Sequence, residues 1–510
     1  MSLLGKFEAQ SAAPSGVSAA ICGVLARRGT DHALAFQGRW YTWKWLDRSR
    51  EQLDDIFRRG RLAESASCAL VVRNRPPHVA AMAAQLASGR PLQMVHSMQS
   101  ATGIAADVEN LRPAVVLSAD DDLSPEVLSA ASNCGAMVVR LSDDDAGAFA
   151  LLEQSCTGRD TARTTVDRSV AVELLSSGTT GKPKRVALSW SAVESMVSDA
   201  HGAYAGTETR TAPLLIVHPL GNIAGISYLA PALAYGQRIV LLEKFEASEW
   251  ADAVRTYRPV RSSIPPVALR LILEVGVPRS SLSSLEVVAV GGGKLAPVLQ
   301  DEFEQTYGIP VLTAYGATEF GGVIANWTLP LYREFGRLKR GSVGRASGGV
   351  ALRVAYPENI ELAPVGNVGL LEVLVPRIGS EWMRTSDWAS LDQDGFLYLH
   401  GRADAAINRG GFKIVPERVA EVLRSHPAVE DAAVVGLANA RLGEVPVAAV
   451  EVKHDSVPPT EGELLQFVRN RVMKYEIPES ILILPRLPRN GAMKVSEPDI
   501  RKLFDNYVCK

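Results

Sequence analysis

Short apolar segments alternate with helical segments along residues 17–315, and this alternation restricts the fold more than any other feature of the chain. Helical segments include residues 78–86 and 297–307. The apolar segments, rich in Val, Ile and Leu, are residues 69–72, 114–117, 137–139, 214–217, 238–242, 285–290 and 310–313. Strands that alternate with helices form layered α/β structures with mostly parallel sheets, so we predict this fold class.

The pattern changes after residue 340, where apolar segments become short and are separated by Gly, Pro and Asp turns such as residues 392–395. This spacing predicts a small antiparallel β subdomain at about 340–400. A compact α+β unit follows, with expected helices near 416–425 and 461–473 and strands near 431–437 and 446–452. A chain of 510 residues is too long to fold around one hydrophobic core. We therefore expect a large domain at 1–403 and a small domain at 404–510.

Composition and charge exclude several classes of protein. The formal net charge of −2, without long runs of one sign, argues against a nucleic-acid or membrane-surface binder. No apolar run approaches the roughly 18 residues that span a bilayer. The first 16 residues lack an apolar signal core, and the five cysteines have neither metal-ligand nor disulfide spacing. We therefore expect a cytoplasmic protein with no membrane span.

A loop rich in hydroxyl groups follows the apolar segment that ends at residue 175. Glycines let a backbone approach a ligand closely, and hydroxyl, N–H and ammonium groups bind phosphate oxygens. A Walker A loop has four residues between its glycines, whereas Gly178 and Gly181 have two, so that class is excluded. The bland alternative is a flexible surface loop. We expect a phosphate site made by Ser176, Ser177, Gly178, Thr179, Thr180, Gly181, Lys182 and Lys184.

Five motifs in order give the chain its resemblance to a known family. They are residues 176–184, 315–319 (YGATE), 386–402 (SD, DGF and GR), 410–414 (GGFKI) and 488–494 (PRNGAMK). Together they resemble the adenylate-forming superfamily of acyl- and aryl-CoA synthetases, peptide-synthetase adenylation domains and luciferases. The resemblance implies an AMP-forming acid–thiol ligase. Such an enzyme uses ATP and Mg²⁺ to form an acyl-adenylate and pyrophosphate, then transfers the acyl group to coenzyme A.

The resemblance assigns roles to the second and third motifs. Glu319 offers a hard oxygen ligand for Mg²⁺, and Thr318 a donor to the α-phosphate. Tyr315 would stack on adenine, Asp387 would accept hydrogen bonds from the ribose hydroxyls, and Arg402 would bind ribose or phosphate oxygens. The alternatives are a solvated turn carboxylate for Glu319, a core aromatic for Tyr315, a turn residue for Asp387 and a surface ion pair for Arg402.

Other roles are implied for residues near the nucleotide and in the small domain. Gly292, Gly293 and Gly316 would lie against the nucleotide. Lys494 would stabilise the carboxylate and α-phosphate during adenylation; its alternative is an inert, solvent-exposed lysine. The small domain would rotate about a hinge at Asp404 and bring a thiol channel at Gly410 and Gly411 to the site.

Three positions depart from the family pattern. Met493 stands where glycine usually precedes the lysine. Arg418 and Ala420 stand where acidic residues are usual, and Glu417 and Glu421 are out of that register. Gly221 and Asn222 stand where many acyl- and aryl-CoA ligases have an aromatic residue and His, while the nearby His218 is interpreted as structural.

The acyl pocket is expected to use Asn222, Gly225, Ala317, Gly321, Gly322 and Val323. Small residues there favour a bulky apolar acid. An amino-acid substrate is disfavoured because residues 221–226 lack an acidic partner for its ammonium group. The alternatives are a stand-alone enzyme that loads an acyl carrier protein and, in another class, a luciferase-like oxygenase or an inactive binding protein. A homodimer is compatible with the sequence.

Overall fold

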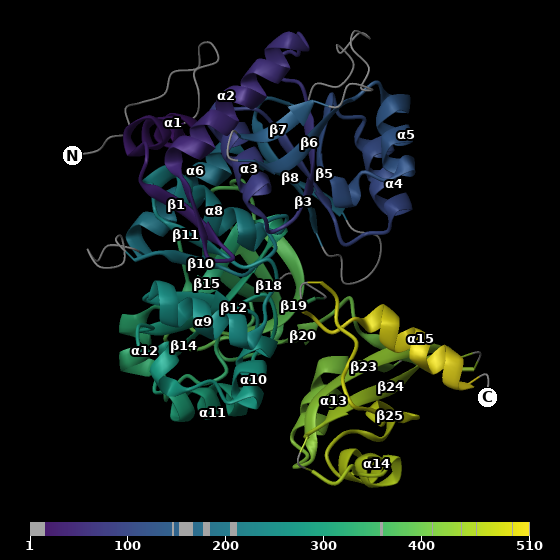
Figure 1. Cartoon of the computed structure of the whole chain (residues 1–510). Helices are drawn as coiled ribbons and strands as arrows, with labels where there is room; N and C mark the ends of the chain where they lie inside the picture. Colours follow the sequence, from purple (N-terminus) through teal and green to yellow (C-terminus); the bar gives the residue numbers. More distant parts are fainter. Residues whose placement is uncertain are drawn as a thin grey trace.

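The computed structural model of the chain describes residues 16–144, 147–151, 167–176, 184–203, 212–357, 361–410, 412–439, 441–454, 456–491 and 493–508. Two large, mostly parallel sheets with helices around them are built from the described residues between 16 and 346 (Figure 1). The predicted α/β class is confirmed. No helix within the described ranges is both long and apolar enough to cross a membrane.

The first large sheet has seven strands in the order β7-β6-β5-β3-β4-β8-β9. Its inner strands pair in parallel, and only β7 and β9 run antiparallel to their neighbours. The strands are β3 (Cys68–Val72), β4 (Leu92–His96), β5 (Val115–Ala119), β6 (Met137–Asp144), β7 (Gly147–Leu151), β8 (Val170–Ser176) and β9 (Lys184–Ser189). The helices of this part are α1 (Gly16–Arg28), α2 (Trp43–Arg59), α3 (Pro76–Ser88), α4 (Ala101–Leu111), α5 (Pro125–Cys134) and α6 (Trp190–Ala203).

The second large sheet has nine strands in the order β16-β15-β14-β13-β12-β10-β11-β1-β2. Strands β1 and β10 to β14 pair in parallel. The strands are β1 (His32–Phe36), β2 (Arg39–Thr42), β10 (Leu214–Ile216), β11 (Ile239–Leu241), β12 (Arg261–Ile264), β13 (Val287–Val290), β14 (Val311–Ala317), β15 (Gly322–Asn326) and β16 (Arg345–Ala346). Its helices are α8 (Ile223–Tyr235), α9 (Ala247–Tyr257), α10 (Pro266–Val275), α11 (Pro297–Tyr307) and α12 (Leu329–Phe335).

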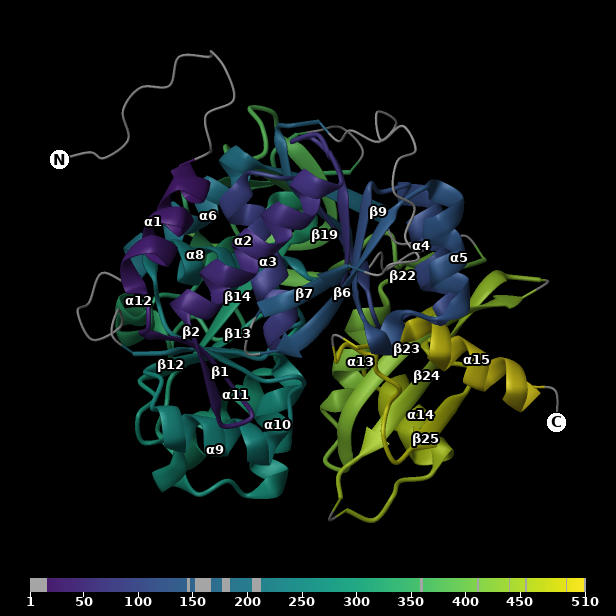
Figure 2. The ribbon, with the colours of Figure 1, turned by 45° about the horizontal axis from the view of Figure 1, so that its top comes forward.

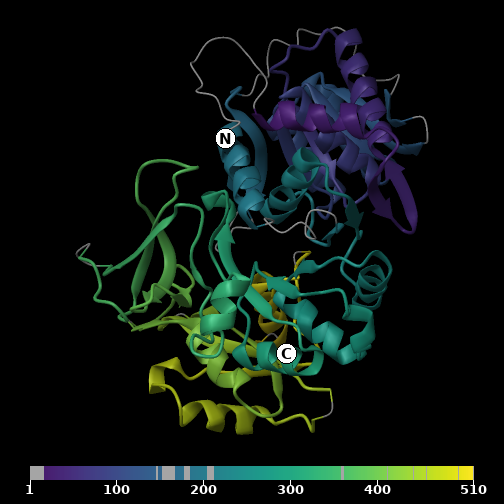
Figure 3. The same cartoon turned by 90° about the vertical axis from the view of Figure 1, so that its left-hand side faces the viewer.

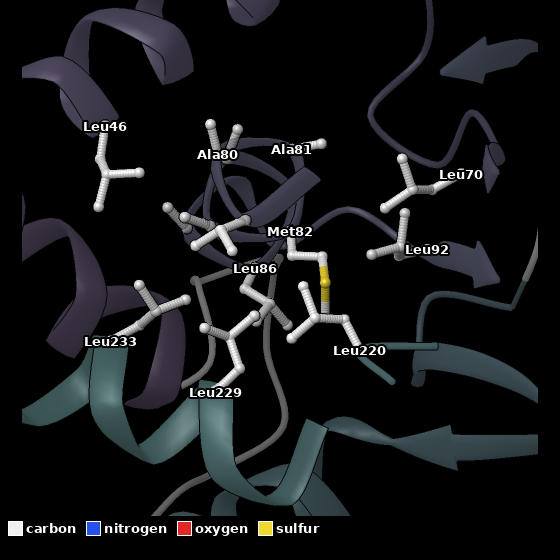
Figure 4. Packing of buried hydrophobic residues seen from close by; sticks show 14 of the residues in the cluster. Leu46, Leu70, Ala80, Ala81, Met82, Leu86, Leu92, Leu220, Leu229 and Leu233 are labelled. Atoms are coloured by element: carbon white, nitrogen blue, oxygen red, sulfur yellow. The ribbon is translucent and has the colours of Figure 1, made fainter. Parts of the chain in front are cut away.

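Helix α3 lies in the core that joins the two large sheets. Every residue from Pro76 to Ala87 is buried, so this helix packs against protein on all sides rather than being amphipathic. Figure 4 shows its Met82 and Leu86 among leucines of β3, β4 and α8. The helix ends at Gly89, whose left-handed φ of 67° favours glycine. This packing fixes the seven-stranded sheet against α8.

A four-stranded antiparallel sheet follows, as the spacing of residues 340–400 predicts. Its strands are β17 (Ala351–Ala355), β18 (Gly369–Leu374), β19 (Met383–Leu391) and β20 (Leu397–Arg402). In Figure 3 this sheet, in green, lies to one side of the nine-stranded sheet. We call residues 16–402 the large unit.

The part of the chain after Asp404 has its own sheet and core, and we call it the C-terminal unit. Alternate residues of β23 face opposite sides, so Val434 packs on α13 and α14 while Val435 packs on α15. Its strands are β21 (Ile407–Arg409), β22 (Phe412–Ile414), β23 (Val429–Asn439), β24 (Gly443–Val452) and β25 (Ile481–Leu484), and its helices are α13 (Pro416–Arg424), α14 (Glu461–Arg469) and α15 (Glu497–Val508). The domain boundary at Asp404 stays a prediction.

Several elements differ from their predicted bounds, and β14 and α14 show two of the reasons. Strand β14 continues to Ala317 instead of ending near 313, because residues 314–317 pair antiparallel with β15. Helix α14 ends at Arg469 instead of 473, since Asn470 occupies its C-cap and Met473 is extended. Tertiary pairing thus lengthens one element, and a poor helix former shortens the other.

Candidate functional site

Predicted site residues from the second motif meet at the carboxyl ends of β13 and β14. Thr318 and Glu319 lie in a short 3-10 turn, η4 (Thr318–Phe320), directly after β14. Thr318 is half-buried and Glu319 is exposed to solvent. Glycines 291–293 follow β13, the neighbouring parallel strand. Ligands of open parallel sheets commonly bind at this edge, where successive strands end.

Tyr315 and Asp387 lie in direct contact. The Tyr315 hydroxyl donates to Asp387 Oδ2 at 2.6 Å, and burial together with the Asp387 charge raises the pKa of Tyr315. Asp387 lies within strand β19, so the alternative of a turn residue is wrong. The ring of Tyr315 packs at an angle on Phe320, with centroids 6.2 Å apart. The hydrogen bond between Tyr315 and Asp387 therefore joins the nine-stranded sheet to the four-stranded sheet.

Arg402 lies opposite Asp387 on the neighbouring strand β20. Its guanidinium donates to Asp404 Oδ1 at 2.7 Å and to Ser386 Oγ at 2.6 Å. Burial acts to raise the pKa of Asp404, but the hydrogen bond and charge of Arg402 outweigh it and lower that pKa. Asp404, the predicted hinge residue, is thus paired with Arg402, a predicted nucleotide-binding residue. Arg402 does form the ion pair that was its alternative role, and its nucleotide-binding role stays a prediction.

Lys494 belongs to a tight turn in the C-terminal unit made by residues 489–491 and 493–495, which we call the Lys494 hairpin. Arg489 and Val495 form an antiparallel bridge across it. Asn490 closes it, because its N–H donates to the Lys494 carbonyl at 2.8 Å and its Oδ1 accepts from the Lys494 N–H at 3.1 Å. A Cβ built on Gly292 would lie 3.8 Å from Lys494 Cε. The hairpin therefore brings Lys494 to the glycine turn after β13.

The charge environment of Lys494 links it to the second and third motifs. Lys494 keeps contact with solvent. Even so, the protein atoms around its ammonium group displace water and lower its pKa. The Arg402 guanidinium lowers this pKa further, and the Glu319 carboxylate opposes both effects. Residues from three separate motifs therefore share one electrostatic environment. Lys494 is solvent-exposed, as its alternative has it, and its catalytic role stays a prediction.

Met493 has a left-handed backbone with φ of 60°. This conformation costs an ordinary residue about 1 kcal/mol or more relative to glycine. Met493 therefore replaces the usual glycine at a position where the backbone conformation favours glycine. A second feature of the hairpin is Gly491, where an added Cβ would meet Met98 Sδ at 2.0 Å. The hairpin accordingly contacts the segment after β4 as well as Gly292.

Residues 177–183 of the predicted phosphate site and Gly411 of the predicted thiol channel lie outside the described residues. Ser176 and Lys184, the two described ends of the phosphate loop, are paired residues of the antiparallel strands β8 and β9. Strand β8 lies against η4, which contains Thr318 and Glu319. The base of the loop is therefore next to the edge where the other motifs meet. Gly410 has a φ of 56° between β21 and β22.

Three of the predicted pocket residues, and Gly316 of the predicted nucleotide site, are glycines held in close packing or in a left-handed conformation. A Cβ on Gly225 would lie 2.5 Å from Leu220 Cα, and one on Gly316 would lie 2.3 Å from the Gly322 carbonyl oxygen. Glycine at these positions thus permits backbone contact rather than leaving open space for an acid. A Cβ on Gly322 would lie 3.3 Å from Ser227 Oγ of helix α8. Gly321 has a φ of 63° and follows η4.

The remaining pocket residues lie at the ends of neighbouring elements. Asn222 is the N-cap of α8, Ala317 ends β14, and the side chain of Val323 on β15 is exposed. His218 lies just before Asn222, with Nε2 at 3.0 Å from Ser263 Oγ and its ring stacked on Tyr228. Burial lowers the pKa of His218 to about 4, so its imidazole is neutral near pH 7. These contacts fit the structural interpretation of this histidine.

The structure adds residues that sequence reasoning did not assign. Arg418, a departure from the family pattern, lies 3.5 Å from the buried carboxylate of Glu476, which it neutralises. Arg489 stabilises the Lys494 hairpin by donating to the Met493 carbonyl at 3.4 Å and to Asp431 at 2.7 Å. Arg489 belongs to the last motif, but its partner Asp431 lies 58 residues away, and no sequence signal joins the two.

Comparisons with known proteins place the chain in a family. A model of the AMP-binding enzyme family matches residues 24–378, and one of the AMP-binding enzyme C-terminal domain matches residues 418–494. The 2-succinylbenzoate–CoA ligase of Bacillus mycoides (strain KBAB4) is 33% identical over 301 residues, or 56% of this chain and 61% of the relative. Indoleacetate–CoA ligase of Aromatoleum aromaticum (strain DSM 19018 / LMG 30748 / EbN1) is 31% identical over 336 residues, or 62% and 63%. The chain thus spans about three fifths of the length of these curated relatives.

Solved structures share the whole architecture. ATP bound MatB from Rhodopseudomonas palustris has a TM-score of 0.82 at 20% identity, covering 96% of this chain and 99% of that one. The o-succinylbenzoate CoA synthetase (MenE) from Bacillus subtilis, in complex with the acyl-adenylate intermediate OSB-AMP, has a TM-score of 0.76 at 23% identity, covering 96% and 98%. These likenesses show the fold. The model of the AMP-binding enzyme family matches well over half of this chain, so the chain belongs to that family.

Proposed function

We propose that this chain is an AMP-forming acid–CoA ligase, which activates a carboxylic acid with ATP and then transfers the acyl group to coenzyme A. The observation that carries the proposal is the position of Lys494 beside Gly292, with the charges of Glu319 and Arg402 acting on its ammonium group. Attack of a carboxylate on the α-phosphate of ATP brings two anions together. A preorganised cation at that point favours the transition state over the separated anions.

The described residues fit Mg²⁺ as the metal of this reaction. Among the described residues no cluster of three or more His, Cys, Asp or Glu side chains could hold a metal ion, which argues against an all-protein site. Mg²⁺ usually binds one or two carboxylates together with substrate phosphates. Glu319 is an exposed carboxylate at the edge where Lys494 lies, and it would hold the ion. When bound, Mg²⁺ would neutralise part of the charge on the phosphates.

The nucleotide would lie along the edge made by glycines 291–293, Tyr315 and Asp387. The second oxygen of Asp387 would accept from a ribose hydroxyl, since the Tyr315 hydroxyl already donates to Oδ2. Thr318 would donate to the α-phosphate. Residues 176–184 would hold the other phosphates, because the described base of that loop adjoins η4.

The acyl group would lie between the start of α8 and strand β15, near Asn222, Ser227 and Val323. Burial lowers the pKa of His218 to about 4, so its neutral imidazole would supply no positive charge to a second carboxylate there. The curated relatives are named for acids with aromatic rings, 2-succinylbenzoate and indoleacetate. We infer that this chain takes a carboxylic acid with an apolar, ring-containing remainder.

The Asp404 segment would act as the hinge of the reaction. It lies between β20, the last strand of the four-stranded sheet, and β21, the first strand of the C-terminal unit. Rotation there would withdraw Lys494 after adenylation and bring Gly410 and Gly411 to the thiol. Breaking the Arg402–Asp404 pair, which is partly exposed, would then accompany the rotation.

The test is pyrophosphate release across a panel of acids that includes indoleacetate, 2-succinylbenzoate, benzoate and medium-chain fatty acids, with ATP and Mg²⁺. We expect acid-dependent pyrophosphate release, and both acyl-CoA and AMP in mass spectra once coenzyme A is added. Release with no acyl-CoA, but with acylation of a holo carrier protein, would assign a carrier protein as the acceptor. Light emission or oxygen uptake from a supplied acyl-adenylate would indicate an oxygenase. No acid-dependent release with any acid would overturn the proposal.

A further inference from the structure

We propose that Arg270 of helix α10 is a positioning residue, which holds the C-terminal unit in the orientation that brings Lys494 to the site. The inference rests on the proposed function and adds to it a residue outside every motif of the chain. In Figures 1 and 2, α10 of the large unit lies beside α13 and β23 of the C-terminal unit. Arg270 crosses this boundary.

Arg270 makes its contacts with two consecutive acidic residues of β23. Its Nη2 donates to the Glu430 carbonyl at 3.1 Å, and its Nε pairs with the Glu430 carboxylate. Its Nη1 lies 3.9 Å from Asp431 Oδ2. The Arg270 side chain is 12% exposed and that of Asp431 is 14% exposed. A cation buried to this degree requires such partners, because burial without them is costly.

Asp431 connects Arg270 to the Lys494 hairpin. The carboxylate accepts from Arg424 Nε at 2.9 Å and from Arg489 Nη2 at 2.7 Å. Burial acts to raise the pKa of Asp431, but these arginines outweigh it and lower that pKa, so the group is an anion. Arg489 in turn donates to the Met493 carbonyl at 3.4 Å. A continuous set of charged contacts thus joins α10 to the residue before Lys494.

The arrangement suits a contact that forms and separates. Arg424 and Arg489 both belong to the C-terminal unit, so Asp431 keeps two cationic partners when the unit moves away. Arg270 is the partner that would be lost, and water can hydrate its guanidinium after separation. The contact therefore favours one orientation without making the movement depend on exposing an apolar surface.

A second ion pair at the same boundary supplies a matched control. Arg486 of the C-terminal unit lies 3.2 Å from Glu274, one turn of α10 beyond Arg270. Its side chain is 70% exposed and that of Glu274 is 39% exposed. Exposed pairs contribute little because water screens their charges. The pairs have the same chemistry and lie at the same boundary but differ in burial.

The experiment compares Arg270→Gln with Arg486→Gln in the full chain, measuring the two half-reactions separately. We expect Arg270→Gln to slow acyl-adenylate formation by about 10-fold or more, as loss of a buried charge contact would. Transfer to coenzyme A from a supplied acyl-adenylate should stay unchanged or become faster. Arg486→Gln should leave both rates within about 2-fold, and Arg270→Lys should recover part of the lost rate.

Hydrogen exchange of the same variants gives a readout that needs no activity. Exchange should rise in residues 486–495 and around Glu430 in Arg270→Gln, but not in Arg486→Gln. If Arg270→Gln does not fold, Glu430→Gln removes the Glu430 carboxylate from the contact and should shift the exchange and the half-reaction rates in the same direction, by a smaller amount. Equal loss in both half-reactions, or unchanged exchange in the hairpin, would overturn the inference. If no acid is activated, the exchange result still decides it, so its failure differs from failure of the proposed function.

Discussion

The surroundings of helix α3 and of helix α10 show two different ways in which this chain joins its parts. Helix α3 is buried along its length among apolar side chains of β3, β4 and α8 (Figure 4). Helix α10 presents Arg270 and Glu274 to the C-terminal unit, where each meets a residue of opposite charge. The first contact unites the two large sheets permanently, and the second joins parts that the proposed reaction must separate.

The physical reason is the cost of separation in water. Exposing apolar surface costs roughly 25 cal/mol for each Å², so the packing of α3 cannot open without unfolding. Separated ions regain hydration, which offsets much of the attraction lost when a buried pair opens. Charged contacts can therefore orient the C-terminal unit without fixing it.

The largest effect is expected at Lys494, where the charged boundary meets the proposed chemistry. Lys494→Ala should lower the rate of acyl-adenylate formation by about 1,000-fold, as removal of a preorganised charged group does. It should leave transfer from a supplied acyl-adenylate within about 3-fold, because the proposed second orientation withdraws Lys494. Rapid-quench measurement of each half-reaction checks this. Lys502→Ala, in an exposed pair with Asp499 on α15, is the control and should change neither rate.

The apolar contact of α3 should respond in stability and not in the ratio of the half-reactions. Leu86 is fully buried, and Leu86→Ala should lower the free energy of unfolding by about 2–5 kcal/mol. Urea unfolding followed by circular dichroism measures this loss. Leu338→Ala is the matched control, since Leu338 is exposed. A changed ratio of half-reaction rates in folded Leu86→Ala protein would contradict the separation of roles between the two helices.

His78 is a titratable group inside the apolar contact and makes its stability depend on pH. Burial, with smaller effects from Arg75 and Arg73, lowers the pKa of His78 to about 3. The unfolded chain therefore takes up a proton more readily, and stability present above pH 6.5 is lost as the pH falls toward 3. At about pH 5 the loss is about 2 kcal/mol. Unfolding of His78→Leu at pH 5 and 7 should lack this loss, and an unchanged pH dependence would refute it.

The smallest effect is expected from a change confined to the C-terminal unit. Thr460 caps α14 by accepting from the Glu463 N–H at 3.2 Å, while the Glu463 carboxylate accepts from the Thr460 N–H at 2.7 Å. Thr460→Ala should lower the free energy of unfolding by about 1 kcal/mol, whereas Thr460→Ser, which keeps the capping hydroxyl, should leave it nearly unchanged. Since α14 is distant in sequence from the boundary residues, the ratio of half-reaction rates should not move. A shift in that ratio would show that stability of the unit itself sets its orientation.

Much of the fold was predictable because it depends on periodicity. Continuous apolar segments such as 69–72 predict buried parallel strands, and the helix at Pro297–Tyr307 begins and ends where its sequence pattern does. The extension of β14 to Ala317 was not predictable, because it requires pairing with β15. That Glu319, Asp387, Arg402 and Lys494 lie at one site was predictable only from the resemblance of their motifs to a known family. Their proximity is a property of the folded chain.

The α/β class, the order of the motifs and the residue types available for binding anions can be read from the amino-acid sequence, since they depend on local pattern and composition. The tertiary structure alone decided that Arg270, Asp431 and Arg489 form one set of contacts reaching the Lys494 hairpin. The physical reason is distance along the chain: charge pairing is specific only once packing has brought side chains within a few ångströms, and no local sequence pattern encodes which distant charges will meet.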